Sequence, residues 1–430
     1  MTKHLTVVGA GFAGVRAALA AADVAARAGG REQIAITVVS PDPVMGIRPR
    51  FYEDRLDGVL VPLDRVLAPV GIRFRRAFAE HLDPDARTLA LGGAEPGTMS
   101  YDQLVLAAGS RLRPPDLDGS VHAVDSFAQA RRLQTAIADL AADTDDGLRA
   151  TVVGAGFTGL ETAAELAGRL RRVAQGAGID PAAVGVALVE RSSDVAPEFG
   201  PRAREAIAGA LEELGVETLT GREVEAVADG GVRLAGGDTI PSLLTVWAGG
   251  PTPSAVGGAL AGLRDESGRI RVGRDLSTAA DGIWAAGDIA RVSADGDHDA
   301  VMSCQHALPQ GSQAGANAAR ALVGKPSRRY AQHLYLTCLD LGGWGALLTE
   351  GWDRDRVLAT GDRGKAFKRF INRGLIYPPA TGRAKDLIAY GRPENVGPAS
   401  AWVQRRALGV PLVRRAITGR APDTAGEFAG

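Results

Sequence analysis

Cysteine is scarce in this chain: only Cys304 and Cys338 occur among 430 residues. The two are far apart in sequence, which excludes the close pairs that redox dithiols and cysteine-rich metal sites require. The six histidines show no HExxH-type spacing, so we predict no metal site. Two unpaired cysteines are compatible with the reducing environment of the cytoplasm.

Long apolar runs and an excess of one charge are also missing. No apolar run reaches the roughly 18 residues that a membrane-spanning helix needs, and a strand predicted almost at Met1 leaves no room for a signal peptide. The formal net charge of −1 predicts no general attraction to nucleic acid or to anionic membranes. With 45% apolar and 23% charged residues, we expect a soluble, cytoplasmic protein of two or three domains.

One phrase is present twice, as VVGAGFAG at residues 7–14 and as VVGAGFTG at residues 152–159. Each copy closes an apolar, β-branched run and opens an alanine-rich stretch without proline, which is typical of a strand that turns into a helix. The GxGxxG spacing predicts a dinucleotide-binding turn with the pyrophosphate at the helix N-terminus. The glycines permit the tight turn, the approach of the pyrophosphate and close helix–strand packing, and they are Gly9, Gly11 and Gly14, then Gly154, Gly156 and Gly159.

The repetition extends beyond the glycines. Residues 71–110 and 215–250 both contain short alternating strands followed by an apolar strand that runs into a turn of small residues. One module used twice explains this pattern. The alternative is a duplicated scaffold in which only one copy still binds a nucleotide.

The residues that end the second strand of each copy differ. In the first copy this strand ends at Ser40, where an acid usually contacts the adenosine ribose; Ser40 itself and Asp42 are the two candidates for that contact. In the second copy it ends at Glu190, which would bind both ribose hydroxyls and repel a 2′-phosphate. Glu190 therefore favours NADH over NADPH, although the adjacent Arg191 would moderate that preference.

Three motifs together carry a resemblance to a known family. VVGAGFAG, DQLVLAAGS at residues 102–110 and GIWAAGDIA at residues 282–290 resemble the two-dinucleotide-binding flavoproteins, the pyridine nucleotide-disulfide oxidoreductase superfamily. The resemblance covers residues 4–325 and implies that the first copy binds FAD, with Asp288 holding the ribityl chain. The implied FAD-binding residues are Gly9, Gly11, Phe12, Ala13, Gly14, Ser40, Ala79, Ala108, Gly109, Gly287, Asp288, Gln305 and His306.

The order of the motifs predicts an α/β fold with two Rossmann-like domains, the second inserted in the first, and a C-terminal α+β domain. The FAD-binding domain would comprise residues 1–113 and 270–324, the NADH-binding domain residues 114–269, and the C-terminal domain residues 325–430. Arg113-Pro114-Pro115 is a stiff crossing between the first two domains. The expected NADH-binding residues are Gly154, Gly156, Thr158, Gly159, Glu161, Glu190 and Gly249.

The electron acceptor is the open question. Disulfide reductases of the superfamily carry a cysteine pair, and peroxidase and oxidase relatives a single cysteine, in the region that here reads SPDPVMGIRPRFYED and contains none. The stretch CQHALPQG at residues 304–311 resembles type II NADH dehydrogenases, where an Ala-Gln-x-Ala-x-Gln pattern starts a helix beside flavin and quinone. Cys304 and Pro309 depart from that pattern, and we expect Pro309 in the first turn of the helix.

Three residues are the candidates for chemistry. Gln305 and Gln310 belong to the quinone-like motif, although Gln305 could equally be a helix-start residue without a chemical role. Glu161, in GFTGLE, matches a glutamate that in type II dehydrogenases lies near nicotinamide and flavin and handles protons; the alternative is an acid in the first turn of a helix, favoured by the helix dipole. Cys304 has no partner cysteine nearby, which disfavours thiol chemistry.

The last hundred residues contain two basic segments. Helical spacing after Gly364 places Phe367, Phe370 and Ile371 on one face and part of a basic set on another; that set is Lys365, Lys368, Arg369 and Arg373. Residues 401–422 are also basic but are interrupted by proline and glycine. The type II enzymes bind the cytoplasmic face of the membrane through such a part; docking on the protein itself or on a second subunit, in a homodimer, is the alternative.

These expectations combine into one functional hypothesis. The chain would oxidise NADH through FAD and pass two electrons to a quinone or quinone-like small molecule. The alternatives are a reductase or dehydrogenase acting on an aromatic or quinonoid natural product, and an NADH-sensing flavoprotein with weak catalysis.

Overall fold

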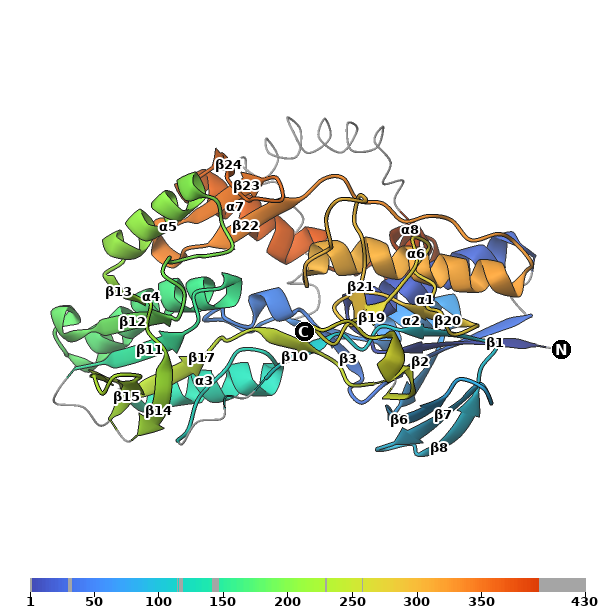
Figure 1. The fold of residues 1–430 in the computed structure, drawn as a ribbon, viewed down its shortest axis with the longest axis horizontal. Helices are drawn as coiled ribbons and strands as arrows, with labels where there is room; N and C mark the ends of the chain where they lie inside the picture. Colours follow the sequence, from blue (N-terminus) through green and yellow to red (C-terminus); the bar gives the residue numbers. More distant parts are fainter. Residues whose placement is uncertain are drawn as a thin grey trace.

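A computed structural model of the chain describes residues 2–29, 33–113, 115, 119–140, 147–228, 230–256 and 258–393. Figure 1 shows an elongated molecule with a large parallel sheet in each half. The C-terminal strands and α7 lie along one side of the second half, and helices α1, α6 and α8 lie over the sheet of the first half.

The first sheet is parallel and has the strand order β20-β9-β1-β2-β5. Its strands are Ile283–Ala285, Gln103–Leu106, Lys3–Val8, Ile34–Ser40 and Arg73–Arg76. The central strands read as nearly continuous apolar runs because both of their faces are covered. Two helices, α1 (Phe12–Arg27) and α6 (Cys304–Leu322), pack against each other on one side. Their backbones touch because glycine stands at Gly311 and Gly315, where a Cβ would lie 2.1 Å and 2.0 Å from carbonyl oxygens of α1.

The second sheet repeats the same arrangement. Its four parallel strands have the order β13-β12-β11-β17 and are Val216–Thr220, Gly185–Glu190, Arg149–Val153 and Leu244–Trp247. Helices α3, α4 and α5 accompany it, over Phe127–Leu140, Phe157–Ala177 and Pro201–Glu213. In both sheets the strand before the glycine-rich turn lies between two others. In the first sheet β1 lies between β2 and β9, and in the second β11 lies between β12 and β17. The matching orders agree with the predicted duplication.

Smaller sheets complete both halves. Three-stranded antiparallel meanders follow the second strand–helix repeat of each half: β6, β7 and β8 (Phe78–Asp83, Thr88–Gly92, Gly97–Ser100) and β14, β15 and β16 (Val224–Ala228, Gly231–Leu234, Thr239–Pro241). The first half also contains β3, β4, α2, β19 and β21 (Val44–Gly46, Leu60–Pro62, Asp64–Leu67, Ile270–Arg271, Ala290–Arg291).

The first two crossings of the chain between the halves pair with each other. Strand β10 (Ser110–Leu112) leads out of the first half, β18 (Pro251–Pro253) leads back, and the two form an antiparallel ribbon. Of the predicted Arg113-Pro114-Pro115 crossing, Pro114 lies outside the described residues. The α/β class with two Rossmann-like units is confirmed, whereas the exact domain boundaries stay a prediction.

The C-terminal part is a third unit of mixed structure. Its antiparallel sheet β22-β23-β24 is followed by α7, a π-helical turn and α8, with bounds Leu336–Asp340, Ala346–Glu350, Arg356–Ala359, Gly361–Phe370, Ile371–Leu375 and Ala384–Gly391. The mixture of strands and helices agrees with the predicted C-terminal α+β domain, and the strands contact α4 and α5 of the second half. Among the described residues, no helix combines the length and the apolar character that crossing a membrane requires.

Candidate active site

The first glycine-rich turn is shaped for an anion. Gly9 adopts φ +103°, and a Cβ there would lie 2.3 Å from the Ala107 carbonyl oxygen. A Cβ on Gly14 would lie 1.9 Å from the Gly9 oxygen, whereas one on Gly11 would meet no atom within 4 Å. Gly11 is the N-cap residue of α1 and no side chain caps this helix. Free N–H groups beside open space fit a diphosphate.

The end of β2 places two predicted FAD residues near each other. The Ala77 N–H donates to the Ser40 carbonyl oxygen at 3.1 Å, so β6, which contains Ala79, starts beside Ser40. Asp42 is exposed. Phe12 and Ala13 open α1, and Ala108 and Gly109 follow β9, so both pairs also flank the carboxyl end of the sheet, where doubly wound folds bind their ligands.

Asp288 belongs to a polar network of which only Asp288 itself was predicted as a site residue. Its Oδ2 accepts a hydrogen bond of 2.6 Å from Ser110 Oγ and lies 3.8 Å from Arg48 Nη1. Arg48 also donates to the Ser110 carbonyl oxygen at 3.1 Å and forms an ion pair with Asp125. Arg48 was not predicted from the sequence, although it lies in the cysteine-free segment that should face the cofactor. The network fixes the Asp288 carboxylate, which fits a role in holding ribityl hydroxyls.

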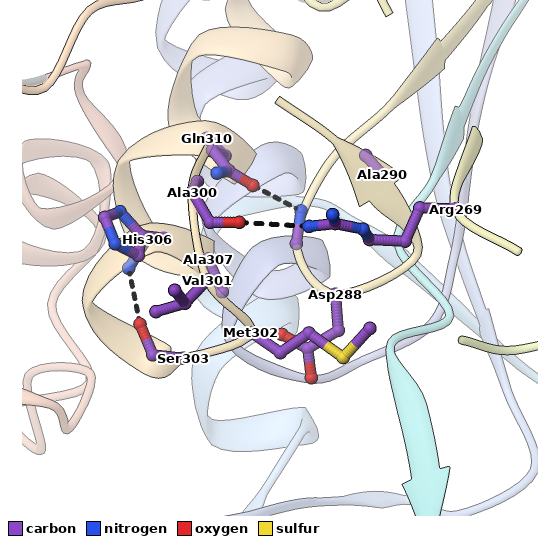
Figure 2. Close-up of a pocket in the computed structure, with 11 residues that line it drawn as sticks. Arg269, Asp288, Ala290, Ala300, Val301, Met302, Ser303, His306, Ala307 and Gln310 are labelled. Carbon is purple, nitrogen blue, oxygen red and sulfur yellow. Dashed lines mark hydrogen bonds between the residues drawn. The ribbon is translucent and has the colours of Figure 1, made fainter. Parts of the chain in front are cut away.

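Gln310 supports the turn that presents Asp288. Figure 2 shows a small pocket between the Gly287-Asp288 turn and the start of α6, where Gln310 points at the backbone of the turn. The buried Gln310 accepts a hydrogen bond of 2.8 Å at Oε1 from the Gly287 N–H. Arg269 closes the pocket on another side by donating to the Ala300 carbonyl oxygen at 3.1 Å. These contacts favour a positioning role for Gln310; its predicted catalytic role is not tested by them.

Gln305 and His306 contact the C-terminal part. With its amide oriented so that both atoms find partners, Gln305 donates to the Leu336 carbonyl oxygen and accepts from the Leu336 N–H. His306 is buried, shares a hydrogen bond of 3.1 Å with Gln332 through Nδ1, and stacks on Tyr335 and Trp352. Burial lowers the pKa of His306 to about 4, so its ring is neutral. Both side chains tie the start of α6 to the C-terminal unit, and their cofactor roles stay predictions.

The expectation for Pro309 was wrong. The helix begins at Cys304 because the Ser303 side chain caps it by accepting from the His306 N–H. Pro309 therefore lies inside the helix, in its second turn, where it removes a backbone donor. Burial raises the pKa of the Cys304 thiol to about 11, which keeps it protonated and agrees with the prediction that thiol chemistry is disfavoured.

The second glycine-rich turn has nearly the same backbone. Gly154 adopts φ +101°, and a Cβ on Gly159 would lie 1.8 Å from the Gly154 oxygen. Gly156 is the uncapped N-cap residue of α4, and Thr158 in its first turn is exposed. A Cβ on Gly249 would lie 2.7 Å from the Trp247 ring, so this predicted NADH residue is also required by local packing.

Glu190 lies at the end of β12 and faces the second turn. Its two carboxylate oxygens accept from the Ala155 N–H at 2.7 Å and from the Ser192 N–H at 2.8 Å. Burial alone would raise the pKa of Glu190, but these two backbone donors hold it below its usual value. An ionised carboxylate has further lone pairs available, so it can also accept ribose hydroxyls.

Glu161 lies one turn deeper in α4 than predicted. The helix starts at Phe157, and no acid is present in its first turn, so the helix-dipole explanation for Glu161 is wrong. Its Oε1 instead accepts from Lys368 Nζ at 2.7 Å and from the Asp340 N–H at 3.0 Å. Both Glu161 and Lys368 are buried, and burial raises the pKa of Glu161 to about 7 although Lys368 opposes the shift.

The ion pair is the centre of a buried cluster at the interface with the C-terminal unit. Asp340 Oδ1 is paired with Lys365, and Asp340 Oδ2 accepts from the Tyr52 hydroxyl at 3.0 Å. Lys368 also donates to the Cys338 carbonyl oxygen at 2.9 Å. Of this cluster, Glu161 was predicted as a site residue and Lys365 and Lys368 only as part of a basic face, because nothing in the sequence shows that residues so far apart meet.

The basic C-terminal set is therefore divided. Lys365 and Lys368 point inward to carboxylates, which corrects the expectation of a basic outer face, while Arg369 and Arg373 are exposed. Phe367 is buried, as predicted from the helical spacing. The second basic segment, residues 401–422, lies outside the described residues.

Comparisons with known proteins agree with this geometry. A family model described as pyridine nucleotide-disulphide oxidoreductase matches residues 3–311. An NADH dehydrogenase-like protein of Mycobacterium tuberculosis is 39% identical over 404 residues, which cover 91% of this chain and 98% of that protein. A type II NADH:quinone oxidoreductase of Staphylococcus aureus is 26% identical over 354 residues, covering 76% and 85%. The structure of NDH2 from Plasmodium falciparum in complex with NADH matches with a TM-score of 0.72 over 96% of this chain and 99% of that chain, at 12% identity.

Proposed function

Because the chain belongs to the pyridine nucleotide-disulphide oxidoreductase family, we propose that it is an FAD-dependent NADH dehydrogenase whose acceptor is a quinone-like small molecule. The family implies binding of FAD and NAD(P)H. When bound, FAD supplies the two-electron carrier between reduced nicotinamide and the acceptor. Two features of the site support this proposal. The first is the presence of two separate glycine-rich turns, and the second is the buried, titratable carboxylate of Glu161, one turn into α4.

The first site has the groups that a permanently bound FAD needs. Gly11 leaves room for the diphosphate at the start of α1, where the helix dipole and free N–H groups favour it. Asp288, fixed by Ser110 and supported through Gly287 by Gln310, would accept from ribityl hydroxyls. Arg48 would offset the negative charge that Asp288 brings to the site.

The second site has the groups that an exchangeable NADH needs. Gly156 and the start of α4 would bind the diphosphate, and Glu190 would accept from both hydroxyls of the adenosine ribose. A 2′-phosphate would meet the Glu190 carboxylate, so NADPH should bind more weakly. Arg191, the next residue, is the one nearby cation in sequence that would reduce this discrimination.

The observation that carries the proposal is the pairing of Glu161 with Lys368. Reduction of a quinone to a quinol takes up two protons, and a carboxyl with a pKa of about 7 can hold and release a proton near neutral pH. The proton would be on Oε2, because Oε1 accepts from both Lys368 and the Asp340 N–H. Lys368 Nζ, 2.7 Å from Oε1, stabilises the ionised form after the proton has left. The pair therefore fits a reaction in which electrons and protons reach the acceptor together.

A stopped-flow experiment tests the proposal. The purified flavoprotein is mixed with NADH or NADPH, and the reduced protein is then mixed with a quinone panel, oxygen or ferricyanide. We expect NADH to bleach the flavin faster than NADPH, and short-chain quinones to reoxidise it faster than oxygen. Failure of both nucleotides to bleach the flavin would falsify the proposed activity.

A variant separates the proton-handling role from a structural one. Glu161→Gln should slow reoxidation by quinones roughly 10²-fold, but reoxidation by ferricyanide should change little because ferricyanide takes up electrons without protons. Glu212→Gln, which removes an exposed carboxylate at the far end of α5, is the matched control. Equal slowing with both acceptors would show that Glu161 supports the fold and carries no proton.

A further inference from the structure

A glutamate from outside the predicted motifs lies over the second glycine-rich turn. A Cβ built on Gly156 would have one atom of the described residues within 4 Å, Glu198 Oε1, at 3.9 Å. The corresponding Gly11 of the first turn has none. The diphosphate of a nicotinamide dinucleotide approaches the backbone at Gly156. The negative charge of Glu198 therefore lies where the two negative charges of the diphosphate would bind.

An arginine of the C-terminal unit holds Glu198 there. Arg354 Nη1 donates to Glu198 Oε2 at 2.6 Å and to the Glu198 carbonyl oxygen at 3.1 Å, and its Nε donates to the Tyr335 hydroxyl at 3.2 Å. The guanidinium also lies 5.5 Å from the centres of the Phe199 and Tyr335 rings. The Arg354 side chain is 8% exposed and that of Glu198 is 52% exposed. The arginine is therefore fixed, whereas the carboxylate is free to turn towards solvent.

The backbone around Glu198 is itself held in place. The Gly200 N–H donates to the Asp353 carbonyl oxygen at 2.8 Å, and the Arg202 N–H donates to Asp355 Oδ1 at 2.7 Å. Phe199 stacks on Phe157, the first residue of α4, with ring centres 6.0 Å apart. Because these contacts fix the segment against both the turn and the C-terminal unit, the part that can leave the diphosphate site is the Glu198 side chain.

We propose that Glu198 and Arg354 together set the affinity of the second turn for the diphosphate of nicotinamide dinucleotides. In the free protein the Glu198 side chain lies beside Gly156, and it turns away when the diphosphate binds. Arg354 keeps its position, and its positive charge, previously neutralised by Glu198, then attracts the diphosphate. This inference rests on the proposed function, because it assumes that the second turn is the nucleotide site. The exchange of one anion for another lowers the affinity and makes release of the oxidised nucleotide faster.

The size of the effect follows from the charges. Like charges a few ångströms apart near a protein surface repel measurably, but exposure and salt screen a carboxylate that can move. We expect Glu198→Gln to tighten binding about three- to tenfold at low salt. At an ionic strength near 1 M, where the Debye length falls to about 3 Å, most of this difference should disappear.

Calorimetric titration of the FAD-loaded protein with ADP-ribose tests the proposal. ADP-ribose carries the adenosine and the diphosphate but no nicotinamide, so its binding is measured without flavin reduction. Wild type, Glu198→Gln and the control Glu212→Gln are compared at low and high salt. Tighter binding by Glu198→Gln alone, with the difference lost at high salt, supports the role of Glu198.

The opposite outcomes are equally informative. Unchanged or weaker binding by Glu198→Gln would overturn the proposal and leave the ion pair as a clamp between the second half and the C-terminal unit. Arg354→Gln, checked for retained flavin and for an unchanged unfolding temperature in the absence of ADP-ribose, should bind ADP-ribose more weakly than wild type, and equal binding would also contradict the proposal. If wild type neither binds ADP-ribose nor is reduced by NADH, the proposed function itself has failed.

Discussion

The two glycine-rich turns of this protein have almost the same sequence and the same backbone, but they lie in different surroundings. The first glycines adopt φ +103° and +101°, and a Cβ on the third glycines would lie 1.9 Å and 1.8 Å from the carbonyl oxygen of the first. Around Gly11 the space is open, whereas Glu198 lies over Gly156. The strand beside the first turn ends in Ser40, and the strand beside the second ends in a carboxylate.

The backbone of each turn therefore provides the site for a diphosphate, and the neighbouring charges determine which ligand binds there and for how long. The uncapped start of α1, with open space at Gly11, suits a diphosphate that remains bound. The second turn has the mobile carboxylate of Glu198 beside Gly156 and the carboxylate of Glu190 at the ribose position, which suits a nucleotide that binds and dissociates in each turnover. A buried titratable pair, Glu161 and Lys368, accompanies the second turn.

The largest effect should come from filling the third glycine of each turn. A Cβ at position 14 or 159 would lie within 2 Å of a carbonyl oxygen, and such overpacking costs about 3 kcal/mol or more because backbone cannot easily move away. Gly14→Ala should be purified without flavin, whereas Gly159→Ala should keep its flavin absorbance but lose reduction by NADH. Gly176→Ala, in a position of α4 with open space, is the control. Loss of flavin in both variants would contradict the assignment of the two turns.

Breaking the buried ion pair should have the next largest effect. Lys368→Gln leaves the Glu161 carboxylate without its cation, and removing one partner of a buried pair costs about 3–5 kcal/mol. Chemical denaturation, followed through the flavin and through circular dichroism, measures the loss. The exposed neighbour Arg369→Gln should change stability by less than about 0.5 kcal/mol. A similar small change for Lys368→Gln would show that the pair contributes little.

The pH dependence of stability should report Glu161 directly. Its pKa is raised from 4.5 to about 7 in the folded protein, so its stabilising contribution is full below pH 4.5 and is lost as the pH rises through about 7. Compared with Glu161→Gln, wild type should lose up to about 3 kcal/mol across this range. Parallel stability curves for the two proteins between pH 4.5 and 7.5 would rule out the raised pKa.

How far the sequence predicts this molecule depends on the range of the interactions. Both turns, their strands and helices, and the ends at Ser40 and Glu190 follow from local patterns, because glycine spacing and apolar runs act over a few residues. The partners of Glu161, Glu198 and Asp288 are Lys368, Arg354 and Arg48, which are far away in the chain and belong to no motif. Only the packing of the C-terminal unit against α4 and α5 brings the first two pairs together. Pro309 was misplaced for a local reason, since the Ser303 cap that starts α6 earlier was not recognised.

The smallest and most specific effect should come from the ribose carboxylate. Glu190→Gln keeps one oxygen, which can accept from the Ala155 N–H or from the Ser192 N–H but not from both, and it exchanges a charged acceptor for a neutral one. Hydrogen bonds to charged groups are worth about 1.5–3 kcal/mol, so NADH affinity should fall about tenfold, while NADPH, relieved of repulsion, should bind as well as before or better. The dependence of the flavin-reduction rate on the concentration of each nucleotide gives both affinities. Arg191→Gln provides the matched comparison, because it should weaken NADPH alone. If Glu190→Gln lowered the affinity for both nucleotides equally, the carboxylate would only stabilise the turn through the Ala155 and Ser192 N–H groups. The difference between Ser40 and Glu190 would then not explain a preference for NADH.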